Sequence, residues 1–83
     1  MTTTEMLRRY GHHRVAFAPA RDQSDGVWRI QFSFDGERDL FIDALTAAKL
    51  AAELRTHGER LFATRIEIAI EQARRSAVSE RAA

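Results

Sequence analysis

The sequence predicts an α+β fold in which a three-stranded antiparallel β-meander is followed by two α-helices packed on one face of the sheet. Large apolar residues alternate with polar ones from Trp28 to Phe34 and again from Arg38 to Ile42, with an Asp-Gly pair between the two runs. That combination is typical of a β-hairpin. After Asp43 the alternation gives way to an alanine- and leucine-rich stretch with helical spacing.

Length and composition indicate one small globular domain. The chain has 83 residues, is 45% hydrophobic and 30% charged, and carries a net charge of +1. We expect a flexible N-terminal tail at residues 1–10, a single α+β domain at 11–78 and a frayed C-terminal tail at 79–83. The chain contains no cysteine, which excludes disulfides and thiolate metal sites. Because so small a core leaves a thin stability margin, association with a second copy would add useful stability.

The first strand is predicted from the alternation of Arg14 to Ala18, which places Val15 and Phe17 on one face. Pro19 follows, and proline lacks the N–H that a central strand donates. Two interpretations remain open: the strand stops at Pro19, or it continues along the edge of the sheet. A turn-rich loop, residues 19–26, leads to the second strand.

The turn between the second and third strands decides which side chains meet. A two-residue turn, Asp35-Gly36, would place acidic residues beside aromatic ones, whereas a three-residue turn that includes Glu37 pairs apolar residues across the strands. Burial favours the second register. We therefore predict that Phe34 lies opposite Arg38, with Gly36 in the left-handed conformation.

Two helices complete the prediction. Asp43 suits an N-cap, the first helix starts at Ala44, and Gly58 suits the position just after its end. The second helix runs from about Glu59 to Val78, a length with which it either reaches the edge of the sheet or overhangs it. The first helix has a wide apolar arc, which indicates contact with two neighbours. The predicted core consists of Val15, Phe17, Trp28, Ile30, Phe32, Phe34, Leu40, Ile42, Leu50, Leu54, Phe62, Ile66 and Ile70.

Motifs for catalysis or cofactor binding are not evident in the sequence. The three histidines, His12, His13 and His57, are not spaced to converge on a metal ion, and adjacent residues on a strand point to opposite faces. The glycines are isolated, so no phosphate-binding loop is expected. We expect no enzymatic activity, no cofactor and no metal site.

Three apolar residues fall outside the predicted core and form the candidate self-association surface. Leu61 and Ile68 lie one heptad apart on nearly the opposite side of the second helix from its apolar stripe, and Phe41 lies on the otherwise polar face of the sheet. We predict a non-catalytic interaction module that forms a homodimer, with a further protein partner as an open option. No apolar run reaches the roughly 18 residues that a membrane span needs, and we expect a cytoplasmic location.

Two stretches resemble regulatory families. The strand–helix–Gly–helix order from Arg38 to Arg75 resembles a ribbon-helix-helix DNA-binding unit, and the order from Arg14 to Leu54 resembles the front half of HicB-type antitoxins. These resemblances imply a DNA-binding or antitoxin-like regulator as the alternative function. The first departs from its family, because Asp39, Phe41 and Asp43 stand where polar or basic residues read DNA, and the two carboxylates repel phosphates. The candidate DNA contacts are Arg8, Arg9, Arg14, Arg65, Arg74, Arg75 and Arg81.

Overall fold

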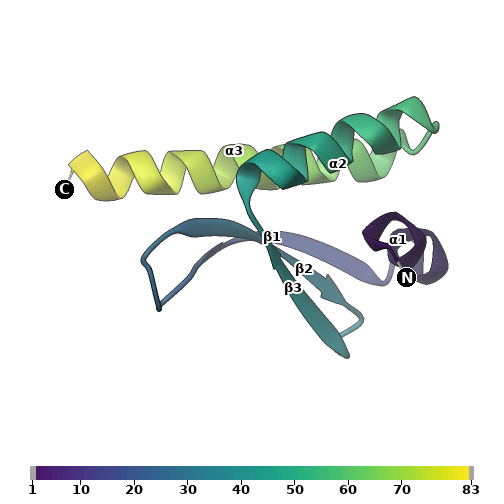
Figure 1. The fold of residues 1–83 in the computed structure, drawn as a ribbon, viewed down its shortest axis with the longest axis horizontal. Helices are drawn as coiled ribbons and strands as arrows, with labels where there is room; N and C mark the ends of the chain where they lie inside the picture. Colours follow the sequence, from purple (N-terminus) through teal and green to yellow (C-terminus); the bar gives the residue numbers. More distant parts are fainter. Residues whose placement is uncertain (1, 83) are drawn as a thin grey trace.

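The computed structural model describes residues 2–82 and has the predicted architecture: one three-stranded antiparallel sheet followed by two helices (Figure 1). The strands follow each other in the order β1-β2-β3 across the sheet. A short helix, α1, precedes them. The elements are α1 (Thr3–Tyr10), β1 (Val15–Arg21), β2 (Trp28–Phe34), β3 (Arg38–Ile42), α2 (Ala44–Thr56) and α3 (Arg60–Ala82).

The β2–β3 connection has the predicted three-residue turn. Phe34 lies opposite Arg38, and apolar pairs such as Ile30 and Ile42 follow along the ladder. Gly36 is left-handed, with φ +74°, and Asp35 shares that conformation with φ +52°. The confirmed register keeps the aromatic side chains of β2 on the face that the helices cover.

Strand β1 continues through Pro19 to Arg21 and forms the edge of the sheet, so the second interpretation of this segment is the correct one. Pro19 lies opposite Ile30 of β2. An edge strand tolerates proline, because the missing N–H faces outward and breaks no ladder hydrogen bond.

Both ends of α2 are fixed by the predicted residues. The Asp43 carboxylate accepts a hydrogen bond from the backbone N–H of Thr46 at 3.0 Å, as an N-cap does. At the other end Gly58 has φ +85°, and the N–H of Glu59 donates to the carbonyl of Leu54 at 2.8 Å. This Schellman arrangement closes α2 and turns the chain directly into α3.

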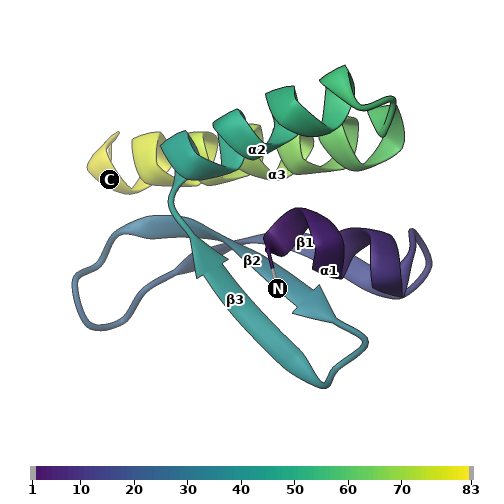
Figure 2. The same ribbon diagram turned by 45° about the vertical axis from the view of Figure 1, so that its right-hand side comes forward.

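The helices form one layer over the sheet. Helix α3 packs on β1 and β2, and α2 packs mainly on α3, so the two helices lie antiparallel side by side (Figures 1 and 2). Every residue of the predicted core is either buried or packed against the buried cluster. The structure adds to this core mainly the small residues of the helix–helix contact and two residues of α1; these are Ala47, Ala51, Ala63, Ala69, Ala73, Met6 and Leu7.

Residues 3–10 form a docked helix and not the flexible tail that we expected for residues 1–10; Met1 lies outside the described residues. Thr2 and Glu5 form a capping box at its start. Met6 and Leu7 are buried, and the ring of Tyr10 lies 5.3 Å from that of Phe34. Helix α1 lies between α2 and the sheet, and α2 itself hardly contacts the sheet (Figure 2). Burial of two large side chains orders a segment whose sequence shows no long periodicity.

Helix α3 also differs from expectation at its end, because it continues to Ala82 in place of fraying from residue 79; Ala83 lies outside the described residues. The indole Nε1–H of Trp28 donates to the Glu80 carboxylate at 2.9 Å. Arg21 approaches the same carboxylate at 3.5 Å. These contacts tie the last turns of α3 to the sheet.

Candidate interaction surfaces

The three residues of the predicted self-association surface are all exposed, but they do not lie together. Leu61 and Ile68 are 54% and 53% exposed on the side of α3 that faces away from the sheet. Phe41 is 57% exposed on the opposite face of the sheet, since its neighbours Leu40 and Ile42 point toward the helices. The structure therefore contains two separate apolar surfaces, one on α3 and one on β3.

The α3 surface, which we call the α3 seam, consists of Leu61 and Ile68 with charged residues beside them. Arg60, Glu67 and Glu71 follow one flank of the seam at spacings of seven and four residues. Glu71 accepts hydrogen bonds from Arg74 and Arg75, and the Arg74 guanidinium lowers the pKa of Glu71. Glu67 likewise pairs with Arg55 of α2, so the flank carries Arg60 at its start and, further along, two acids that already have partners within the chain.

The open face of the sheet offers little apolar area around Phe41. Across the strands Phe41 lies opposite Gln31, which lies opposite Ala18. A single aromatic side chain beside a small residue and an amide is an ordinary surface feature.

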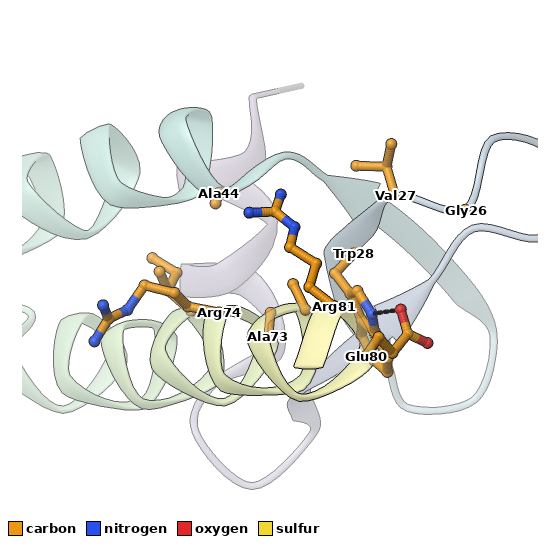
Figure 3. A pocket seen from close by; sticks show the side chains of 10 residues that line it. Gly26, Val27, Trp28, Ala44, Ala73, Arg74, Glu80 and Arg81 are labelled. Carbon is orange, nitrogen blue, oxygen red and sulfur yellow. Dashed lines mark hydrogen bonds between the residues drawn. The ribbon is translucent and has the colours of Figure 1, made fainter. Parts of the chain in front are cut away.

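A third surface, not found from the sequence, is a groove beside the C-terminal half of α3. Helix α3 has 23 residues and α2 has 13, so the last turns of α3 extend beyond the start of α2 (Figure 1). The groove has a volume of about 540 Å³ (Figure 3). Its apolar walls are formed by Val27, Trp28, Ala44, Ile70, Ala73 and Ala77.

Charged groups border this C-terminal groove. Arg81 reaches across it toward Ala44, whereas the Arg74 guanidinium extends along α3 and away from it (Figure 3). Glu80 is on the other side, where its carboxylate is held by Trp28 and Arg21. The groove therefore combines apolar walls with one guanidinium at its opening.

Leu45 of α2 and Val78 of α3 are also exposed, at 66% and 56%, but neither lines the groove. The sequence carried one relevant signal, the length of the second helix, which predicted that this helix reaches the edge of its own sheet or overhangs it, but nothing about its position relative to α2. Trp28, a predicted core residue, is half-buried against the core, and part of its surface lines the groove.

The loop between β1 and β2 supports one end of the groove. Arg29 donates hydrogen bonds to Asp22 at 2.7 Å and to Asp25 at 2.8 and 3.1 Å. Arg29, together with the backbone N–H of Val27, lowers the pKa of Asp25 to about 2. These bonds fix the loop from which Val27 enters the groove.

The histidines do not assemble a metal site. His12 stacks on Phe62 with ring centroids 4.0 Å apart, and its Nδ1 atom is buried without a hydrogen-bond partner in the described part of the chain. His13 is exposed, and His57 lies at the C-terminus of α2. Among residues 2–82, no three His, Cys, Asp or Glu side chains are grouped so that they would hold a metal ion.

Comparison of the chain with protein-family models, with curated proteins and with solved structures finds no match. Across the described residues, no helix has both the length and the apolar character that crossing a bilayer requires.

Proposed function

We propose that the protein is a non-catalytic interaction module that forms a homodimer through the α3 seams of two copies. The observation that carries this proposal is the pair of half-exposed side chains, Leu61 and Ile68, one heptad apart on a long helix with complementary charges beside them. An 83-residue chain has a small hydrophobic core and therefore a low free energy of unfolding. Burial of this pair against a second copy adds stability that the monomer lacks.

A two-fold axis favours an antiparallel pair of α3 helices. In such a contact the same surface of each copy meets its counterpart, so residue i touches j and residue j touches i. With an antiparallel orientation, Leu61 of one copy lies opposite Ile68 of the other, and the reverse contact follows from symmetry. The two apolar pairs flank the axis near Thr64, a small side chain that lets the helices approach.

The charges beside the seam suit this orientation. When Leu61 lies opposite the partner's Ile68, Arg60 lies opposite residue 69 of the partner. Along the axis of the partner's helix, position 69 is midway between the partner's Glu67 and the partner's Glu71. Those two acids lie on the flank that an antiparallel pair brings together. Both acids already have partners in their own chain, so a contact with Arg60 of the other copy biases orientation and register only weakly, by about 0.2–1 kcal/mol for each exposed pair.

A DNA-binding or antitoxin-like regulator has weaker support. Arg14 donates to Asp35, and both Arg74 and Arg75 donate to Glu71, so much of the basic charge proposed for DNA is paired within the chain. A DNA-binding surface needs a concentrated excess of basic groups. Strand β3 also pairs with β2 of the same chain, whereas the strand of a ribbon-helix-helix unit pairs with a second subunit.

Sedimentation equilibrium tests the homodimer. The wild type should dimerise by about 500 μM, and Ile68→Glu should be monomeric at that concentration with an unchanged circular dichroism spectrum. The matched control is Leu45→Glu, which introduces the same charge at an exposed apolar residue of α2 outside the seam. Phe41→Glu should also leave the dimer intact. A monomeric wild type, or dimers that survive Ile68→Glu, would contradict the proposal.

A charge exchange tests the antiparallel register separately. Arg60→Glu places a third acid on the flank and should weaken dimerisation about fivefold, which corresponds to about 1 kcal/mol. Adding Glu67→Arg and Glu71→Arg to that variant restores opposite charges and should recover the affinity. If the single and the triple variant weaken dimerisation equally, the flanks of the two copies do not meet.

A further inference from the structure

We infer that the C-terminal groove is a binding site for a small amphipathic carboxylate, a ligand with an apolar body and one anionic end. The groove shares no residue with the α3 seam, so this inference does not depend on the homodimer. Its support comes from the walls of the groove, its volume and the charge at its opening.

The walls of the groove are suited to an apolar body. Trp28 and Ile70 supply large apolar surfaces that are only partly buried within the chain, and Ala73 and Ala77 supply small side chains that leave room between them. A volume of about 540 Å³ falls within the range of small-molecule sites, about 300–1,000 Å³. An alkyl or aromatic group placed there would remove both its own surface and the indole face from water.

The charge at the opening selects an anion. Arg81 extends across the groove, and its guanidinium offers paired N–H donors that match a carboxylate (Figure 3). The nearby acid, Glu80, is already engaged by the Trp28 indole and by Arg21. Arg74 is bonded to Glu71, so Arg81 is the cation best placed to meet the ligand.

A second copy of this chain is a poorer occupant. In a two-fold contact the groove would face itself, which would bring the Arg81 guanidinium at its opening toward its counterpart. Like charges at an interface oppose association. An anionic ligand meets no such repulsion, and its carboxylate would neutralise the guanidinium.

Trp28 gives a direct readout, because it is the only tryptophan of the chain and lines the groove. Octanoate serves as the probe and 1-octanol as its uncharged analogue, both titrated into the full-length protein while indole fluorescence is recorded. Octanoate should give a saturable change with a Kd on the order of 1 mM, and octanol should bind at least about fivefold more weakly. No saturable change with octanoate, or equal binding of octanol, would overturn the inference.

Two variants with matched controls locate the site. Arg81→Gln should weaken octanoate binding about tenfold without changing octanol binding, whereas Arg75→Gln, on the outer side of α3, should leave both unchanged. Ala77→Phe should fill the groove and abolish binding of both probes, and Ala48→Phe, at an exposed position of α2, should not.

If Ala77→Phe does not fold, two-dimensional NMR of the wild type and of Arg81→Gln tests the same site. The indole Nε1–H of Trp28 gives one resonance, and octanoate should shift it in the wild type and much less in Arg81→Gln. A resonance that does not move in the wild type, or moves equally in Arg81→Gln, would overturn the inference.

Discussion

Replacement of Leu7 by alanine tests whether α1 belongs to the folded core. Leu7 is fully buried, with 0% of its surface exposed. Removing such a side chain costs the lost burial and the cavity that remains, about 2–5 kcal/mol for Leu→Ala. We expect the lower half of this range, because a terminal helix can shift to close part of the cavity. In a domain of this size each kcal/mol lowers the Tm by about 4–8 °C, so the melting point should fall by at least ~8 °C.

The assay for Leu7→Ala is urea unfolding followed by circular dichroism, at one fixed protein concentration because dimerisation would add to the apparent stability. The matched control is Leu45→Ala, the same chemical change at a residue that is 66% exposed. It should change the free energy of unfolding by no more than about 0.5 kcal/mol. If Leu7→Ala is no more destabilising than this control, α1 is not docked and residues 1–10 are a tail after all.

Further predictions concern contacts that hold the sheet. Arg65 donates to the carbonyls of His12 at 2.9 Å and Val15 at 2.6 Å, so Arg65→Met should cost about 2–4 kcal/mol in urea unfolding by leaving both acceptors without a donor. Gly36→Ala should cost about 1 kcal/mol through its left-handed backbone alone, because an added Cβ meets no atom within 4 Å. The pKa of Asp25 is lowered to about 2, so its contribution to stability is complete above pH 4 and lost as the pH falls toward 2; Asp25→Asn should flatten the pH dependence of Tm in that window.

The strands and their register could be predicted from local sequence. The alternation of β2 and β3, with Asp35-Gly36 between them, allowed two registers. Only the register with Phe34 opposite Arg38 pairs the apolar residues of the two strands on one buried face, and this is the register observed. The caps of α2 were equally local, because Asp43 and Gly58 act on backbone groups a few residues away. Interactions over such short separations depend little on the rest of the chain.

The two ends of the chain could not be predicted in the same way. Residues 3–10 form too short a helix to show a clear period, and α1 is ordered by burial of Met6 and Leu7 against elements far along the sequence. The last turns of α3 are likewise held by Glu80, whose partners Trp28 and Arg21 lie more than fifty residues earlier. Such contacts exist only once the chain has folded.

The candidate surfaces also differ in whether local sequence or tertiary structure determines them. The sequence by itself determined that Leu61 and Ile68 are excluded from the core stripe of α3, because a helical period assigns each residue to a face. Only the tertiary structure decided that Phe41 lies on a different side of the molecule, and that Trp28 opens onto a groove where α3 outruns α2. The physical reason is that periodicity fixes direction within one element, whereas a shared surface depends on how elements of unequal length are placed against each other.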